Sequence, residues 1–103
     1  MAGPADKAGT ILVVDDEPMI LELLRTTLRA EGYDVIAAKD GEGCLEKLDM
    51  ENRPDVIILD VGMPGMDGLE ACRRIRADYP DLDAPIVFLT ARKERRDVEE
   101  AIA

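Results

Sequence analysis

Several side chains that could bind a cation or a phosphoryl group follow directly after short apolar segments of the chain. They are Asp15 and Asp16 after the first segment, Asp60 after the third and Thr90 after the fourth. Carboxylates a few ångströms apart repel one another by on the order of 1–4 kcal/mol near a protein surface. A cluster of them therefore needs retained protons or a bound cation. A ligand set made only of oxygen favours Mg²⁺, or else Mn²⁺, over zinc.

Each of these aspartates also has a purely structural interpretation. Asp is common after strands, where it forms turns and caps helices. The run Asp16-Glu17-Pro18 is itself typical of a helix entry. The functional interpretation therefore depends on whether the fold brings the three carboxylates together.

Short apolar segments alternate with amphipathic ones along the chain. Strands are predicted over residues 11–14, 33–37, 55–59 and 86–89. Helices are predicted over residues 18–30, 42–50 and 94–102. A further helix is predicted to follow an N-cap at Asp67 and to end before a link over 79–85. This order predicts an α/β fold with a doubly wound parallel sheet and helices on both faces. Ligands of such sheets bind beyond the carboxyl ends of the strands, which is where the carboxylates and Thr90 are expected.

Helical spacing predicts which side chains face the sheet. In the helix over 18–30 these are Ile20, Leu23, Leu24, Thr27 and Leu28, and in the helix over 42–50 they are Leu45 and Leu48.

Composition limits the classes of function. The 103 residues allow one domain, predicted over residues 10–103 after a flexible tail over 1–9. The net charge of −10 disfavours direct nucleic-acid binding, and the absence of His removes histidine bases and ligands. The apolar runs are too short to cross a membrane and no secretion leader is evident, so a cytoplasmic protein is expected. Cys44 and Cys72 are interpreted as ordinary reduced thiols.

The most specific stretch is the loop that follows Asp60. It reads Asp60-Val61-Gly62-Met63-Pro64-Gly65-Met66-Asp67-Gly68. Glycines let a backbone approach a ligand closely, and Pro64 stiffens the loop before the next helix.

Together, these motifs resemble the receiver domain of bacterial two-component response regulators. The residues that carry the resemblance are the Asp15-Asp16 pair, Leu59-Asp60 with Met63-Pro64 and Met66-Asp67-Gly68, and Phe88-Leu89-Thr90-Ala91. The resemblance runs collinearly from Thr10 to the last residue. It implies a flavodoxin-like sheet with strand order 2-1-3-4.

The resemblance also implies roles for single residues. Asp60 would accept a phosphoryl group from a sensor histidine kinase or a histidine phosphotransfer protein. Asp16 would bind Mg²⁺ directly, Asp15 would bind it through water, and the backbone carbonyl of Gly62 would be a further ligand. Thr90 would move its hydroxyl onto a phosphoryl oxygen, and Ala91 would keep the pocket open.

The chain departs from the family after its fourth predicted strand. Family members continue into a fifth strand and a fifth helix, with a lysine that pairs with the phosphoryl group. Lys93 follows Thr90 too closely to replace that lysine, and a solvated lysine at a helix start is its simplest interpretation. We therefore expect a piece of a longer protein, marginally stable alone. Its exposed fourth-strand edge would be open to a homodimer or a domain swap.

Three functions follow from this pattern. The leading one is a phosphoacceptor signalling switch, which is regulatory and at most catalyses its own phosphorylation and dephosphorylation. The second is a non-phosphorylated interaction module of the same fold. The third is a Mg²⁺-dependent aspartyl phosphohydrolase, which commonly has a second Asp two residues after its nucleophile, where this chain has Gly62.

Overall fold

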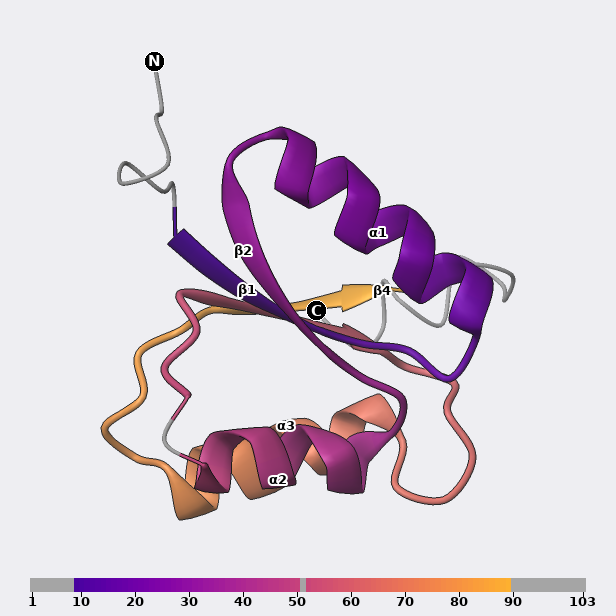
Figure 1. Ribbon diagram of the computed structural model, residues 1–103. Coiled ribbons are helices and arrows are strands. Elements are labelled where there is room, and N and C mark those ends of the chain that lie inside the picture. Colours follow the sequence, from indigo (N-terminus) through magenta and orange to yellow (C-terminus); the bar gives the residue numbers. More distant parts are fainter. Residues whose placement is uncertain (1–8, 51, 90–103) are drawn as a thin grey trace.

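The computed structural model describes residues 9–50 and 52–89, which form a four-stranded parallel sheet with three helices (Figure 1). The elements are β1 (Gly9–Val14), α1 (Pro18–Ala30), β2 (Tyr33–Ala38), α2 (Gly41–Asp49), β3 (Val56–Asp60), α3 (Gly68–Asp78) and β4 (Ile86–Leu89). The strands lie in the order β2-β1-β3-β4, which confirms the predicted flavodoxin-like fold and its strand order. The helix predicted over 94–102 lies outside the described residues.

Helices cover the two faces of the sheet unequally. Figure 1 shows α1 on one face and α2 with α3 on the other. The buried core lies on the α2 and α3 side, and its large side chains are Leu12, Val14, Leu48, Ile57, Leu59 and Ile75. On the other face, α1 contributes no buried residue.

The packing of α1 differs from the prediction at two positions. The side chain of Leu23 is 61% exposed, and Thr27 is exposed as well. Ile20, Leu24 and Leu28 are half-buried, as the spacing predicted. Within the described part of the chain, no second helix lies beside α1, so only a narrow stripe of α1 is covered.

The amino end of β1 is fastened to the segment before β3. The Asp55 N–H donates to the Thr10 carbonyl at 2.7 Å, and the Thr10 N–H donates to Asp55 Oδ2 at 2.8 Å. We call this pair of bonds the Thr10–Asp55 clasp. The strand begins at Gly9, which pairs with Tyr33 of β2, so one residue of the tail predicted over 1–9 belongs to the sheet. The rest of that predicted tail lies outside the described residues.

Asp side chains cap two of the helices. The Asp67 carboxylate accepts the Glu70 N–H at 2.9 Å, as predicted for an N-cap. The Asp40 carboxylate accepts the Gly43 N–H at 2.6 Å, and α2 therefore begins at Gly41, one residue earlier than predicted.

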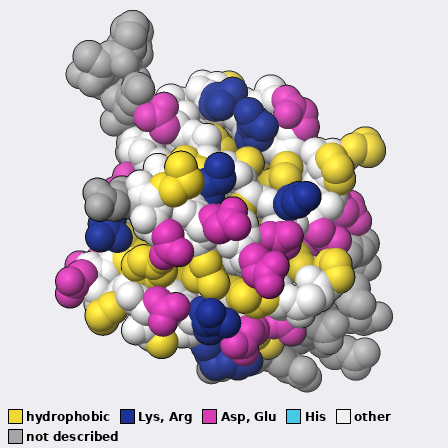
Figure 2. All heavy atoms as spheres, turned by 60° about the horizontal axis from the view of Figure 1, so that its bottom comes forward, with side chains coloured by type: hydrophobic (Ala, Val, Ile, Leu, Met, Phe, Trp, Pro, Cys, Tyr) yellow, Lys and Arg dark blue, Asp and Glu magenta, His cyan; other side chains and the backbone are white. Residues whose placement is uncertain are grey.

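The fourth strand forms one edge of the sheet. Among the described residues, β4 pairs only with β3, and the Val87 side chain is 50% exposed. Figure 2 turns the α2 and α3 side forward and shows Asp and Glu side chains scattered among apolar and basic ones. Within residues 9–50 and 52–89, no helix has the length and apolar content that a membrane crossing requires.

Candidate metal centre

The carboxyl ends of β1 and β3 bring three aspartates together. Val14 of β1 is level with Leu59 of β3, so Asp15, directly after β1, lies beside Asp60, the last residue of β3. Asp16 is the next residue along the chain. One carboxylate oxygen from each of the three residues lies within 4.8 Å of the other two. The predicted convergence of these carboxylates is therefore observed in the fold.

Two of these carboxylates are deeply buried and partly hydrogen-bonded. Asp15 is 0% exposed and Asp60 is 1% exposed. Asp15 Oδ1 accepts the Glu17 N–H at 2.9 Å, and the Asp15 N–H donates to the Ala38 carbonyl at 3.2 Å. Asp60 Oδ1 accepts the Gly62 N–H at 3.1 Å. The backbone thus fixes both residues and satisfies one oxygen of each.

The remaining oxygens suit a hard cation. Asp60 Oδ2 and Asp16 Oδ1 are buried, and neither accepts a hydrogen bond from any residue that the structure describes. Such atoms lose the hydrogen bonds of water without replacement, which costs about 1–3 kcal/mol for each group. Carboxylate oxygens close together and without donors are the ligands that Mg²⁺ prefers. The donor set therefore fits the predicted ion.

The pKa of Asp60 reflects its surroundings. Burial, assisted by the nearby charges of Asp15 and Asp16, raises the pKa of its carboxyl from 3.8 to about 6. The hydrogen bond from the Gly62 N–H acts in the opposite direction. Without a cation, the cluster thus holds a proton more readily than an ordinary aspartate.

The loop after Asp60 approaches the end of β3 closely. A Cβ atom on Gly68 would overlap the backbone carbonyl oxygen of Asp60, so α3 can begin there only with glycine. Gly65 has a φ of 74°, in the left-handed region that favours glycine. Met63 is 4% exposed and belongs to the core. Gly65, Gly68 and Met63 of the motif therefore have structural reasons.

Other predicted site residues are not placed by the structure. Thr90, Ala91 and Lys93 lie outside the described residues. Gly62 is described and exposed, and its N–H rather than its carbonyl has a contact at the site. Its role as a metal ligand stays a prediction.

Comparison with known proteins identifies the family. The profile of the response regulator receiver domain matches residues 11–103, nearly the whole chain. The chain belongs to the response regulator receiver domains. Receiver domains are regulatory parts of two-component systems, in which response regulators interact with histidine kinases. They generally bind Mg²⁺ at an acidic pocket.

One curated relative is the alkaline phosphatase synthesis transcriptional regulatory protein PhoP of Bacillus subtilis. It is 49% identical over 87 residues, which are 84% of this chain and 35% of PhoP. The chain thus spans about a third of the length of this relative.

Solved receiver structures have the same fold. The N-terminal domain of a response regulator receiver protein from Methanoculleus marisnigri is 41% identical, with a TM-score of 0.79 over 91% of this chain and 76% of that one. TrrA from Thermotoga maritima, solved in complex with Mg²⁺ and BeF, is 44% identical. Its TM-score is 0.74 over 89% of this chain and 79% of that one.

Proposed function

We propose that this receiver domain is a phosphoacceptor switch in which Asp60 takes a phosphoryl group in the presence of Mg²⁺. The observation that carries the proposal is the cluster of Asp15, Asp16 and Asp60 at the carboxyl ends of β1 and β3. One carboxylate oxygen from each residue lies within 4.8 Å of the other two. A buried carboxylate with an unsatisfied oxygen is a suitable nucleophile once its proton is displaced.

The chemistry requires little covalent help from the protein. An oxygen of Asp60 forms a bond to phosphorus while the phosphorus–nitrogen bond of a phosphohistidine breaks, and the imidazole nitrogen keeps the electron pair of that bond. The Gly62 N–H holds Oδ1 and so orients the carboxylate. Asp16 and Asp60 would bind Mg²⁺ directly, Asp15 through water, and the Gly62 carbonyl would complete the protein ligands. When bound, Mg²⁺ would neutralise charge on the phosphoryl oxygens.

The remaining assignments belong to the same proposal. The phosphodonor is a sensor histidine kinase or a histidine phosphotransfer protein in the cytoplasm. Phosphorylation replaces one negative charge by about two, and Thr90 would respond by binding a phosphoryl oxygen while Ala91 leaves room for it. The edge of β4 would pair with a second copy of the chain. No output activity is carried over from PhoP, because the chain matches only 35% of that protein.

Acetyl phosphate provides a direct test. The protein is incubated with acetyl phosphate and Mg²⁺, and its intact mass is measured, since the chain has no Trp for a fluorescence assay. We expect one added phosphoryl group that is stable in acid and labile in base. The adduct should be absent in Asp60→Asn and present in Asp81→Asn, which removes an exposed carboxylate in the link before β4.

The other outcomes are equally informative. Steady release of phosphate over many turnovers would identify a phosphohydrolase instead. Absence of both Mg²⁺ binding and an adduct would overturn the proposal and leave an interaction module.

A further inference from the structure

The structure shows a contact that joins the loop after Asp60 to the start of α2. The three atoms nearest to a Cβ built on Gly41 all belong to the Met66 side chain, with Sδ at 2.8 Å, Cγ at 2.9 Å and Cβ at 3.0 Å. Real Cβ atoms essentially never lie this close to another side chain, so Met66 occupies the space that the missing side chain of Gly41 leaves. Gly41 is buried and is the first residue of α2.

The loop itself has few other attachments. In the described chain, none of the backbone N–H groups of residues 63–67 donates to another backbone carbonyl. The loop is held instead by Met63 in the core and by Met66, which packs against the core and on Gly41. Met66 is therefore one of the side chains that hold the loop in place. That loop also carries Gly62, whose N–H orients the Asp60 carboxylate.

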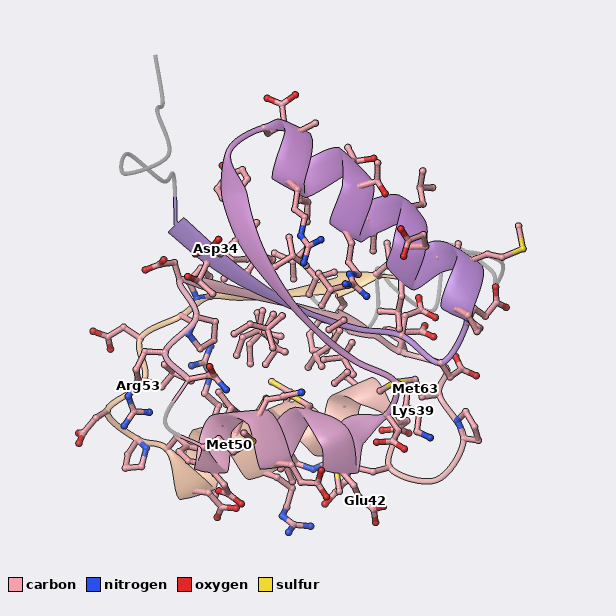
Figure 3. All side chains as sticks on the ribbon, in the orientation of Figure 1. Asp34, Lys39, Glu42, Met50, Arg53 and Met63 are labelled. Carbon is pink, nitrogen blue, oxygen red and sulfur yellow. The ribbon has the colours of Figure 1, made fainter. Side chains whose placement is uncertain are left out.

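The start of α2 is in turn fixed to the other half of the site. The Ala38 carbonyl at the end of β2 accepts the N–H of Asp15. The Asp40 carboxylate caps α2 by accepting the Gly43 N–H at 2.6 Å. Figure 3 places Lys39, from this β2–α2 junction, and Met63, from the loop after β3, at the same end of the molecule. Met50 and Arg53 lie at the opposite end. The junction thus contacts the elements that carry Asp15 and those that carry Gly62.

We infer that Gly41 and Met66 are positioning residues of the metal centre, and that the β2–α2 junction sets the spacing between Asp15 and the loop after Asp60. This inference rests on the proposed function, because it concerns the same Mg²⁺ site. Neither residue needs to touch the ion. A side chain on Gly41 would push Met66 away and move the loop, and with it the Gly62 backbone.

A double-mutant cycle tests the inference on the full chain. The variants are Gly41→Ala, Met66→Ala and the double variant. The control is Met50→Ala, which removes an exposed methionine side chain at the carboxyl end of α2. Each is checked for folding by circular dichroism. Mg²⁺ affinity is then measured by calorimetry, and the Gly62 amide resonance is recorded by NMR in the absence of metal.

We expect Gly41→Ala to weaken Mg²⁺ binding by about tenfold, the usual effect of disturbing the residues behind metal ligands. It should also shift the Gly62 amide resonance. Met66→Ala removes two of the three close atoms, so the double variant should bind Mg²⁺ about as well as Met66→Ala alone. If alanine at position 41 acted only through helix stability, it would weaken Mg²⁺ binding equally in the wild type and in Met66→Ala. The control Met50→Ala should bind Mg²⁺ like the wild type.

Two results would overturn the inference while the wild type still binds Mg²⁺ and is phosphorylated. One is wild-type affinity in Gly41→Ala, and the other is an equal loss in both backgrounds. If Gly41→Ala does not fold, Met66→Ala by itself tests the inference, because this variant creates no clash. The inference then requires that Met66→Ala bind Mg²⁺ more weakly than Met50→Ala. A wild-type chain that binds no Mg²⁺ would instead refute the proposed function, and the inference with it.

Discussion

Asp60 combines two demands that conflict in the absence of a cation. In the proposed reaction its carboxylate must be ionised to attack phosphorus, yet burial and two neighbouring carboxylates favour its protonated form. A bound cation reverses that preference because it favours the ionised carboxylates. Readiness for the reaction is thus linked to metal binding at a single residue.

This conflict predicts a pH dependence of stability. In the metal-free fold, the carboxyl of Asp60 holds its proton up to a pKa of about 6, against 3.8 ordinarily. Because the folded state binds the proton more tightly than the unfolded state, the contribution of Asp60 to the free energy of unfolding falls as pH rises through this interval. Asp60→Asn lacks this loss. In urea unfolding with a chelator, its advantage over the wild type should grow from about pH 4 to about pH 6 and then level off.

Saturating Mg²⁺ serves as the control for that measurement. It should raise the stability of the wild type near neutral pH and have little effect on Asp60→Asn. An identical pH dependence of the two proteins would show that Asp60 is not the titrating group.

At the scale of the elements, the helix that follows the loop after Asp60 depends on one cap. The Asp67 carboxylate accepts the Glu70 N–H at 2.9 Å, at the start of α3. Asp67→Ala should lower the free energy of unfolding by about 1 kcal/mol, whereas Asp67→Asn keeps an acceptor and should cost less. Thermal unfolding of both variants checks this. Equal losses would mean that the charge, rather than the hydrogen bond, is what stabilises α3.

Local patterns predicted most elements because their signals lie within a few residues. Pro18 and Gly32 bound α1 as expected, and Asp67 caps α3. The start of β1 was predicted less well, because the pairing of Gly9 with Tyr33 of β2 joins residues far apart in the sequence. The same holds at the site. The positions of the three carboxylates followed from strand ends, whereas the packing of Met66 on Gly41 has no local signal.

At the scale of the whole molecule, the two faces of the sheet should differ in their contribution to stability. Leu48 of α2 is fully buried, whereas Leu23 of α1 is 61% exposed. Leu48→Ala should cost about 2–5 kcal/mol, and Leu23→Ala less than about 1 kcal/mol. Chemical denaturation of the two variants provides the comparison. Similar losses would show that Leu23 is covered in solution, by a second copy of the chain or by other parts of the protein.

This asymmetry was beyond the reach of the sequence pattern. Helical periodicity identified the apolar side of α1, including Leu23, but it carries no information on how many neighbours that side meets. In the described chain, α1 lies on its face of the sheet without a second helix, so the width of the covered stripe is set by architecture and not by spacing.

The Thr10–Asp55 clasp lies at the opposite end of the sheet from the carboxylates, yet it fixes their alignment. Asp15 lies five residues after Thr10, and Asp60 lies five residues after Asp55. Equal path lengths along two parallel strands bring both side chains out at the same height. Deleting one residue from either strand would displace one carboxylate by about 3.3 Å and turn it to the other face of the sheet. The alignment of the two carboxylates at one end of the sheet thus depends on an equal number of residues between each of them and the clasp at the other end.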